Sequence, residues 1–328
     1  MNKVRWGLLS TANINRRLIP PIRNSKRGEL VAVASRSEET AKAYAEKWKI
    51  PHYFGSYEAL LDSGIVEVLY IALPNHLHAE WSIRAMQAGL HVLCEKPLSI
   101  SLESVDAMIH ASRQYKRILA EAFMYLHHPQ TKIAREWVQS GRLGEICSIF
   151  GTFTFQIRDR QNIRLVPEYG GGSLWDVGVY PLSYAQYLLD TIPDWVFGTQ
   201  WLGATGVDEA FAGQLHYPGN CITQFTCGFR SPWSTSLEVV GTEGRLSLNR
   251  PFHEMQRGRR MAFYPAEGNP YVIPVPKMEL YSGEIEAMHA AILDGADPVP
   301  SLEDSSKYVQ TVIALYESAR TDQVVPLL

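Results

Sequence analysis

Three side chains that could carry out acid–base chemistry lie in two short segments of this chain. Lys96 closely follows the apolar run 91–93, which is typical of a buried strand. In open α/β sheets, ligands bind beyond the carboxyl ends of the strands. A run of three glycines at 170–172 precedes a predicted helix, on which Asp176 and Tyr180 stand four residues apart and so share one face. Together, these side chains could bind a hydroxyl group and move its proton.

Each of these features also has an ordinary structural explanation. A lysine at a strand end is often a solvated charge, and an Asp/Tyr pair at helical spacing is common on protein surfaces. A run of glycines is often only a loop. The functional interpretation gains weight because all three features accompany a nucleotide-binding pattern in the same chain.

The first part of the chain alternates short apolar runs with helical patterns. Strands that alternate with helices favour right-handed βαβ units and a parallel sheet. We therefore predict an α/β fold whose residues 1–122 form a dinucleotide-binding Rossmann domain. The predicted strands are 4–9, 30–35, 66–72, 91–95 and 118–122, and the predicted helices are 13–24, 39–48, 79–88 and 102–115.

The second part, residues 123–328, shows consecutive strands with little helix between them. Turn residues at 217–220 and 241–244 predict hairpins, so we expect a large and mostly antiparallel sheet in an α+β domain for substrate binding and oligomerisation. A basic stretch at 257–260 is most simply a solvated turn. The predicted strands are 147–155, 195–202, 209–217, 221–229, 235–240 and 245–248, and the predicted helices are 131–140, 173–189, 282–293 and 302–320.

Composition narrows the classes of function. With 328 residues, 46% hydrophobic and 20% charged, the chain suits a soluble enzyme of two domains. A net charge of −3 gives no basic footprint for nucleic acid, and no apolar run is long enough to span a membrane. A strand at 4–9 leaves no room for a signal peptide before it, so we expect a cytoplasmic protein. No pair of its four cysteines forms a C-x-x-C motif, and free thiols are expected.

The turn after the first predicted strand stands where a dinucleotide fingerprint, G-x-G-x-x-G, would lie. Its three glycine positions hold Ser10, Ala12 and Asn15 instead. Small side chains still allow a close approach, and the N–H groups of the following helix can still bind phosphate. The candidate cofactor-binding residues of this turn are Ser10, Thr11, Ala12, Asn13 and Ile14.

The end of the second predicted strand distinguishes the two nicotinamide cofactors. An acidic residue there would bind the ribose hydroxyls of NAD. This chain has Ser35 and Arg36 instead, and an arginine can pair with the 2′-phosphate of NADP. We therefore favour NADP, with NAD still possible. The structural alternative is a surface arginine that only caps a loop.

The two segments described first resemble the motifs of the glucose–fructose oxidoreductase / inositol dehydrogenase / rhizopine catabolism (Gfo/Idh/MocA) family. Its hallmark Glu-Lys-Pro matches 95–97 and places the catalytic lysine at Lys96, and Asp-x-Gly-x-Tyr matches 176–180. A tyrosine at the last position resembles the dihydrodiol dehydrogenases and NADP-dependent xylose dehydrogenases. The resemblance covers essentially the whole chain. It implies hydride transfer between a nicotinamide and a secondary or lactol carbon of a sugar, sugar derivative or cyclic polyol.

The resemblance extends to a third cofactor segment after the third predicted strand. Residues 73–78 are similar to the P-x-x-x-H segment that lies along the nicotinamide ribose in the family. His76 and His78 could instead suggest a metal site, but no third ligand has a convincing spacing, so we predict no metal. Each histidine alone is more often a hydrogen-bonded structural residue. The residues implied to bind cofactor here and at the Glu-Lys-Pro motif are Leu73, Pro74, Asn75, His78, Glu95 and Lys96.

The family chemistry implies roles for the three residues named first. Tyr180 would be the acid/base, and Lys96 would hold the reacting oxygen and lower the pKa of the tyrosine. Asp176 would bind a second substrate hydroxyl or orient the lysine. The opposite assignment, with the lysine as proton carrier, stays open. Candidate substrate residues are Tyr125, His128, Arg158 and Trp175, although Tyr125 and His128 could equally pack a domain junction.

Other functions fit the same residues. A trans-dihydrodiol dehydrogenase would use them with a more apolar pocket, and a cofactor-binding regulator of the same fold would lack catalysis. The presence of the lysine, aspartate and tyrosine together favours an enzyme. A sheet with one face uncovered by helices would expose an apolar patch, and from this we predict a symmetric homodimer or a tetramer of such dimers.

Overall fold

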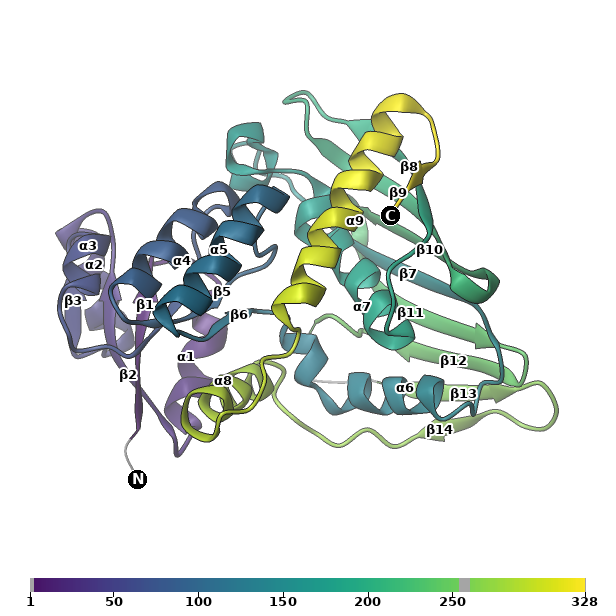
Figure 1. Cartoon of the computed structure of the whole chain (residues 1–328), viewed down its shortest axis with the longest axis horizontal. Coiled ribbons are helices and arrows are strands. Elements are labelled where there is room, and N and C mark those ends of the chain that lie inside the picture. Colours follow the sequence, from purple (N-terminus) through teal and green to yellow (C-terminus); the bar gives the residue numbers. More distant parts are fainter. Residues whose placement is uncertain (1–2, 254–259, 328) are drawn as a thin grey trace. The chain divides into compact units, whose positions relative to one another are not determined.

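The computed structural model describes residues 3–253 and 260–327 (Figure 1). The contacts within the chain divide it into two compact units. Unit 1 comprises the residues up to His127 together with Glu279–Ser306, and unit 2 comprises His128–Met278 and the residues from Lys307 onward.

Unit 1 contains a parallel sheet of six strands: β1 (Val4–Leu9), β2 (Gly28–Ala34), β3 (His52–Phe54), β4 (Val68–Ile71), β5 (His91–Cys94) and β6 (Leu119–Glu121). Their order, β3-β2-β1-β4-β5-β6, is that of a doubly wound dinucleotide-binding fold, so the predicted Rossmann domain is confirmed. The strand order reverses between β1 and β4, and every residue of β4 is buried. The short strand β3, at the edge of the sheet, was not predicted.

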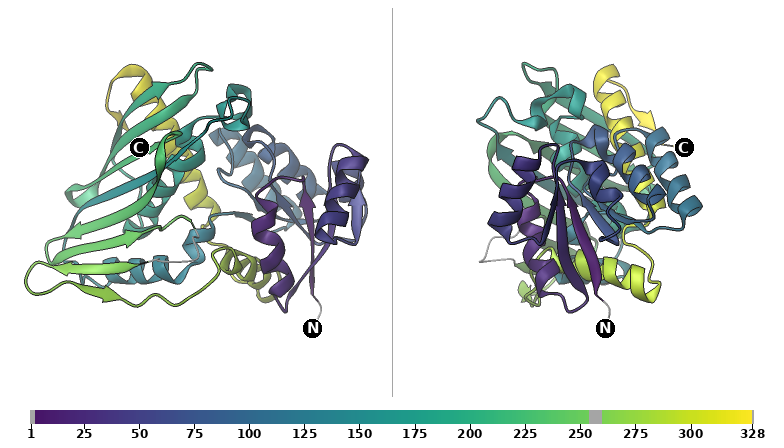
Figure 2. Two further views of the ribbon diagram at one scale, coloured as in Figure 1. Left: turned by 180° about the vertical axis from the view of Figure 1, so that it is seen from behind. Right: turned by 90° about the vertical axis from the view of Figure 1, so that its left-hand side faces the viewer.

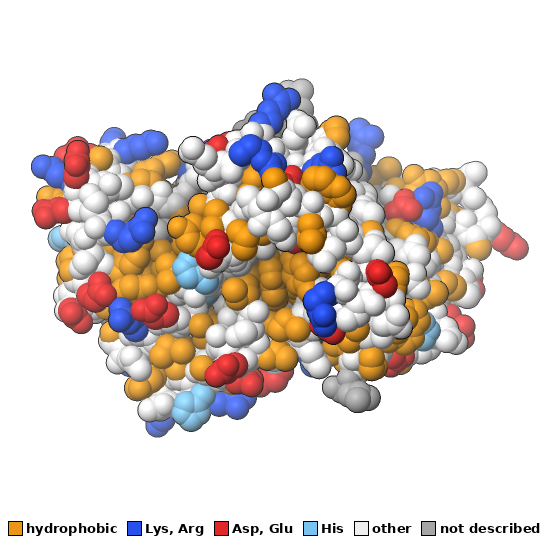
Figure 3. Space-filling model, turned by 90° about the horizontal axis from the view of Figure 1, so that it is seen from above, with side chains coloured by type: hydrophobic (Ala, Val, Ile, Leu, Met, Phe, Trp, Pro, Cys, Tyr) orange, Lys and Arg blue, Asp and Glu red, His pale blue; other side chains and the backbone are white. Residues whose placement is uncertain are grey.

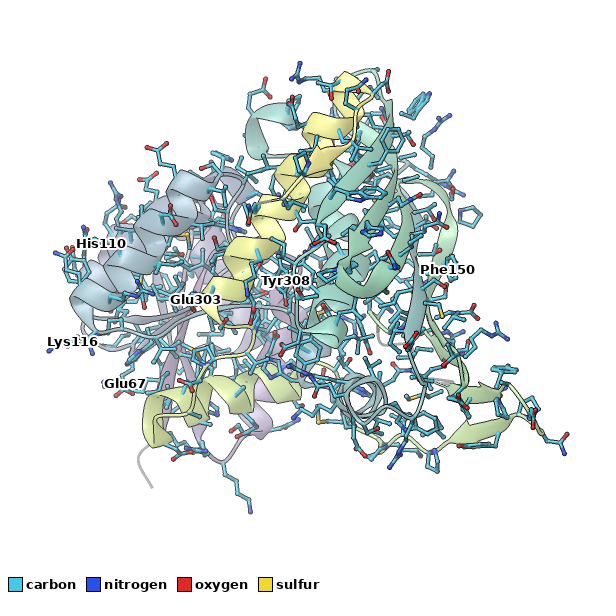
Figure 4. The ribbon with its side chains drawn as sticks, turned by 45° about the vertical axis from the view of Figure 1, so that its right-hand side comes forward. Glu67, His110, Lys116, Phe150, Glu303 and Tyr308 are labelled. Carbon is cyan, nitrogen blue, oxygen red and sulfur yellow. The ribbon has the colours of Figure 1, made fainter. Side chains whose placement is uncertain are left out.

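Helices connect the strands of unit 1: α1 (Asn15–Asn24), α2 (Glu38–Trp48), α3 (Tyr57–Leu61), α4 (His78–Gln87) and α5 (Leu102–Tyr115), with the 3-10 turns η1 (Asn75–Leu77) and η2 (Met124–His127). Three of them begin after a serine whose hydroxyl accepts an N–H of the first turn, namely Ser37 for α2, Ser56 for α3 and Ser101 for α5. The helices α4 and α5 lie side by side (Figure 1), and the side chains of His110, within α5, and of Lys116, directly after it, point outward (Figure 4).

A helix from far along the chain completes unit 1. This helix, α8 (Ser282–Asp294), packs against α1. The indole N–H of Trp6 in β1 donates to Nε2 of His289 in α8 at 2.9 Å, and both side chains are buried. Residues 279–306 thus belong to unit 1. The prediction of one continuous second domain from residue 123 differs here, because the contact joins residues that are distant in the sequence.

Unit 2 contains a nine-stranded sheet: β7 (Ile146–Gln156), β8 (Trp195–Leu202), β9 (Asp208–Tyr217), β10 (Cys221–Gly228), β11 (Arg230–Gly241), β12 (Gly244–Asn249), β13 (Met261–Pro265), β14 (Tyr271–Ile273) and β15 (Val325–Pro326). Among the described strands of this sheet, only the pairing of β7 with β10 is parallel, so the predicted antiparallel character is confirmed. Both predicted hairpins are present, between β9 and β10 and between β11 and β12. Of the predicted basic turn at 257–260, only Arg260 lies within the described residues.

The helices of unit 2 gather on one face of its sheet (Figure 2, left). They are α6 (Pro129–Gln139), α7 (Val179–Leu189) and the part of α9 (Leu302–Thr321) that follows residue 306. A bond from Gln186 Nε2 to Thr311 Oγ1, at 2.8 Å, joins α7 to α9. The other face of the sheet carries exposed side chains, and Figure 4 shows Phe150 of β7 on the side away from α9.

On the face drawn in Figure 3, basic and acidic side chains are both present and are scattered among hydrophobic atoms. None of the helices in the described parts of the chain is long and apolar enough to cross a bilayer.

Candidate functional site

The carboxyl edge of the sheet in unit 1 carries all the residues predicted to bind a cofactor. Ser10 follows β1, Ser35 follows β2, Leu73 comes soon after β4, and Glu95 follows β5. This edge includes the point between β1 and β4 where the strand order reverses, which is where doubly wound folds bind nucleotides.

The turn after β1 has a geometry that explains its missing glycines. Ser10 has φ 135, a backbone region that favours glycine, and its hydroxyl donates to the carbonyl of Ala72 at 3.0 Å. The same hydroxyl accepts the N–H of Ala12 at 3.2 Å, and the buried amide of Asn15 donates to the Ser10 carbonyl at 2.8 Å. Side-chain hydrogen bonds therefore stabilise, without glycines, a turn conformation that glycines usually adopt.

This turn leads into the N-terminus of α1. No side chain caps that N-terminus, and the first turn of α1 contains no acidic residue. The positive end of the helix dipole and its N–H groups are therefore suited to an anionic group such as a pyrophosphate.

Arg36 is exposed and lies two residues after the end of β2. Its neighbours are fixed, because the N–H of Ser35 donates to the carbonyl of Phe54 at 3.0 Å and the hydroxyl of Ser37 caps α2. Burial raises the pKa of Tyr57, and the positive charge of Arg36 partly offsets this rise. Arg36 thus stands at the carboxyl edge, and its charge acts on Tyr57.

His78 holds the third predicted cofactor segment from inside. Its ring is fully buried, with Nδ1 2.8 Å from the carbonyl oxygen of Pro97 and Nε2 2.9 Å from that of Leu73. Burial lowers the pKa of this imidazole. His78 is therefore a structural residue in this geometry: its two hydrogen bonds connect the segment after β4 to the segment after β5. Pro74 and Asn75, in contrast, are only partly buried.

Lys96 stands next to two carboxylates. Glu95 accepts from the hydroxyl of Tyr70 and, at 3.3 Å, from the N–H of Lys96. Glu121, at the end of β6, is buried and accepts the N–H of Leu98 at 2.7 Å. Burial raises the pKa of Glu121 to about 7, an effect that its hydrogen bonds and the charge of Lys96 partly offset. Lys96 thus stands in an acidic environment.

Sequence reasoning missed Glu121 and a second buried acid, Glu284 of α8. Burial raises the pKa of Glu284, and the charge of Glu95 raises it further. The sequence did contain one indication of Glu121, because this carboxylate stands at the end of an otherwise apolar strand. No comparable signal marked Glu284, because it reaches this region through the packing of a distant helix.

The second part of the candidate site lies in unit 2, where a glycine-rich turn leads into a helix. The predicted helix over 173–189 is present, and its first part, η5 (Leu174–Gly178), is a π-helix that continues into α7. A side chain on Gly178 would stand 2.7 Å from Leu174 Cδ1 and 2.9 Å from Cys227 Sγ, so a glycine lets this helix lie against β10. Short π-helical segments are frequent at functional sites.

Asp176 of η5 forms an ion pair with an arginine that was not predicted. Arg164, in the 3-10 turn η3 (Ile163–Leu165), donates its Nε to Asp176 Oδ2 at 2.6 Å. The predicted substrate residue Arg158 is exposed and donates instead to Gln156 Oε1 at 3.2 Å. The structure therefore places Arg164, and not Arg158, beside Asp176.

Tyr180 is packed among aromatic rings. Its ring centroid lies 5.1 Å from that of Phe153 and 5.5 Å from that of Phe252, and 6% of the residue is exposed. The predicted substrate residue Trp175 is buried, and its ring centroid lies 5.9 Å from that of Tyr316. The tyrosine thus stands in apolar surroundings.

The other predicted substrate residues are also buried. Tyr125 of η2 lies beside Phe123, with 5.8 Å between their ring centroids. Nδ1 of His128 accepts the N–H of Gln130 at 3.1 Å and so caps α6. Both of these partners belong to the same unit as the residue that they contact.

The predicted residues are thus divided between the two units. Lys96 and the cofactor candidates belong to unit 1, whereas Asp176 and Tyr180 belong to unit 2. Among the residues of known position, no group of three His, Cys, Asp or Glu side chains could hold a metal ion.

Two family models match this chain. One, described as an oxidoreductase family with an NAD-binding Rossmann fold, matches residues 4–123. The other, described as the GFO/IDH/MocA C-terminal domain, matches residues 131–247. The two matches fall in the two parts of the chain that were predicted to differ in fold.

Individual proteins match over almost the full length of the chain. The D-xylose 1-dehydrogenase (NADP(+)) 2 of Haloferax volcanii is 36% identical, covering 98% of this chain and 99% of the relative. A 3-ketoreductase from Actinomadura kijaniata, solved with NADP and TDP-benzene, has a TM-score of 0.90 at 30% identity, with 97% of this chain and 98% of that chain covered. The aldose-aldose oxidoreductase of Caulobacter crescentus, solved with glycerol, has a TM-score of 0.91 at 26% identity, with 99% and 100% covered.

Proposed function

Because this chain belongs to the Gfo/Idh/MocA family of oxidoreductases, we propose that it transfers a hydride between NADP and a secondary or lactol carbon of a sugar, sugar derivative or cyclic polyol. The observation that carries this proposal is the near full-length similarity to an NADP-dependent xylose dehydrogenase. The nicotinamide supplies or accepts the hydride when it is bound. The residues of this chain bind the two reactants, orient them and move a proton.

The residues at the carboxyl edge of the sheet in unit 1 fit NADP, which carries a 2′-phosphate in addition to its pyrophosphate. The uncapped N-terminus of α1 would hold the pyrophosphate, next to the turn fixed by Ser10 and Asn15. Arg36 is exposed at the position where it would pair with the 2′-phosphate. The remaining proposed contacts are Thr11, Ala12, Asn13, Ile14, Ser35, Leu73, Pro74, Asn75, Glu95 and Lys96.

The proton of the reacting hydroxyl must leave as the hydride leaves. In this proposal Tyr180 accepts that proton and Lys96 holds the oxygen, while Asp176, oriented by Arg164, binds a second hydroxyl. Support comes from the two family motifs, which contain Lys96, Asp176 and Tyr180. If Lys96 carries the proton instead, a Tyr180→Phe variant will keep a pH-dependent kcat and a Lys96→Met variant will lose it.

A second candidate substrate is an aromatic trans-dihydrodiol. The observation that favours it is the packing of Tyr180 against Phe153 and Phe252, which would suit an apolar substrate. A substrate panel with NADP as oxidant, containing pentoses, hexoses, inositols and a trans-dihydrodiol, separates the two candidates.

The first experiment is a fluorescence titration of the purified protein with NADPH and then with NADH. We expect tighter binding of NADPH in the wild type and loss of this preference in Arg36→Ala. The matched control is Arg113→Ala, because Arg113 is exposed at the end of α5, where it pairs with Glu303 at 2.9 Å. Helices run opposite to the strands in βαβ units, so Arg113 lies at the other edge of the sheet. If neither cofactor binds, the proposed function is wrong.

For the uncovered face of the sheet in unit 2, we retain the proposal of a symmetric homodimer, alone or within a tetramer. Phe150 of β7 is 42% exposed, Trp201 of β8 is 46% exposed and Tyr264 of β13 is 38% exposed. Large apolar groups on a face that helices leave open favour burial against a second copy of the same face.

A further inference from the structure

A carboxylate buried in unit 2 holds the turn that precedes the π-helix η5. Asp208, the first residue of β9, is 2% exposed. Its Oδ2 accepts the hydroxyl of Ser173 at 2.6 Å and the N–H of Leu174 at 2.8 Å. Its Oδ1 accepts the hydroxyl of Tyr316, on α9, at 2.7 Å. One side chain thus joins β9, the start of η5 and α9.

The turn itself lies directly against this carboxylate. Gly172 has φ 120, and a side chain there would stand 2.2 Å from Asp208 Oδ1 and 2.7 Å from the hydroxyl oxygen of Tyr316. Only a glycine fits both the backbone conformation and the space. The position of the turn is therefore set by Asp208 and Tyr316, not by its own sequence alone.

Both members of the Asp176–Arg164 ion pair are attached to the same turn. The N–H of Asp176 donates to the carbonyl of Gly172 at 3.1 Å. The N–H of Gly172 in turn donates to the carbonyl of Arg164 at 2.9 Å. A shift of the turn would therefore move both partners of the pair.

Burying the carboxylate of Asp208 costs free energy, because the charged form is removed from water. Burial raises the pKa of Asp208 to about 6, and its hydrogen bonds only partly offset this rise. Without an acceptor here, the N–H of Leu174 and two hydroxyl groups would lose their partner in a buried place. Packing alone does not require a polar side chain at this position, whereas a fixed turn with three converging donors requires a hydrogen-bonding partner there.

We propose that Asp208 is a positioning residue: it fixes the Gly172–Ser173 turn and, through it, the orientation of Asp176 and Arg164. Its effect on catalysis rests on the proposed function, but its effect on the turn does not. The mechanism requires no contact between Asp208 and the substrate.

The experiment compares Asp208→Ala with Asp208→Asn. Hydrogen exchange of the peptide spanning 172–178, followed by mass spectrometry, reports on the turn without any substrate. We expect faster exchange there in Asp208→Ala. The asparagine can accept from Ser173 and Leu174 through its oxygen and donate to the phenol oxygen of Tyr316 through its amide, so Asp208→Asn should keep the protection.

Steady-state kinetics give the second measurement. In Asp208→Ala we expect kcat with the sugar to fall by about 100-fold, which a displacement of about 1 Å can cause, while the affinity for NADPH stays unchanged. Asp208→Asn should restore most of kcat. The matched control is Ser318→Ala on α9, because Ser318 also holds a buried bond, accepting the N–H of Gly198 at 3.0 Å. It should lower the Tm without changing kcat or exchange at 172–178.

Each outcome bears on the proposal. Exchange at 172–178 that stays as in the wild type in Asp208→Ala overturns it, and so does faster exchange with an unchanged kcat. If Asp208→Ala does not fold, Ser173→Ala removes a single donor, and unchanged exchange in that variant overturns the proposal equally. If the wild type oxidises no sugar with NADP, the proposed function fails, and the exchange data still decide whether Asp208 fixes the turn.

Discussion

Arg164 holds the carboxylate of Asp176 through a 2.6 Å hydrogen bond from its Nε. The side chain of Asp176 is largely buried, whereas that of Arg164 is 41% exposed. Since the bond leaves the guanidinium group partly in solvent, the arginine can orient the carboxylate and still contact a polar ligand. This pairing defines the surroundings in which the proposed second substrate hydroxyl would bind.

Replacing Arg164 should weaken sugar turnover far more than cofactor binding. A hydrogen bond to a charged group contributes about 1.5–3 kcal/mol, so we expect Arg164→Ala to lower kcat/KM for the sugar by about 10- to 100-fold. The affinity for NADPH, measured by fluorescence titration, should stay as in the wild type. Arg158→Ala is the control and should change kcat/KM little, because Arg158 is exposed and donates to Gln156 at the end of β7. Equal losses in both variants would contradict this account of the site.

Ser10 combines a strained backbone with a useful hydroxyl. Ser10→Gly removes the strain at φ 135 and also the bond to the Ala72 carbonyl, two effects of about 1 kcal/mol each and of opposite sign. We therefore expect nearly unchanged stability. Ser10→Ala keeps the strain and loses the bond, so its free energy of unfolding should fall by about 1–2 kcal/mol. Thermal and urea unfolding of both variants measure this, and an alanine variant as stable as the glycine variant would disprove the assignment of strain.

Glu121 should make stability depend on pH between about 4.5 and 7. Burial raises its pKa from 4.5 to about 7 in the folded protein. Within this window the folded state keeps a proton that the unfolded state releases, so stability falls as the pH rises and levels off above 7. Glu121→Gln, which can still accept the N–H of Leu98, removes this loss. We expect it to raise the free energy of unfolding by about 1–3 kcal/mol at pH 8 and by less at pH 5.

Unfolding curves of both proteins at pH 5, 6, 7 and 8 provide the measurement. The matched control is Glu103→Gln, because Glu103 also belongs to unit 1 but is exposed on the first turn of α5. A stabilisation by Glu121→Gln that is the same at pH 5 and pH 8 would show that the carboxyl group does not titrate in this window.

Phe150 tests the proposed dimer. Phe150→Glu places a charge on the open face of the sheet in unit 2, and two such charges would be buried together in a symmetric interface. Size-exclusion chromatography with light scattering should then show a dimer or tetramer for the wild type and a smaller species for the variant. Leu293→Glu is the control, because Leu293 is 46% exposed on α8 of unit 1 and therefore lies outside the sheet of unit 2. A monomeric wild type at micromolar concentration would refute the proposal.

The sequence predicted the elements of this protein well because their signals are local. Strands and helices of the Rossmann domain follow from alternating apolar runs, and the hairpin at 217–220 follows from its turn residues. The short strands β3, β13, β14 and β15 escaped prediction. Each has exposed residues and depends on a neighbouring strand more than on its own pattern.

The candidate site divides in the same way. Lys96, Asp176 and Tyr180 could be named from motifs, since their residue types and spacing are visible in one dimension. Their partners could not be named. Arg164 reaches Asp176 from a separate loop, and Asp208 reaches the glycine turn from a strand that begins far along the chain.

The amino-acid sequence by itself determined which segments form strands and helices, because hydrophobic period and turn chemistry act over a few residues. Only the tertiary structure decided that α8 joins unit 1 through the Trp6–His289 bond, and that Glu121 is a buried acid beside Lys96. Burial, ion pairing and pKa shifts arise where distant segments exclude water together. No local pattern records which segments those are.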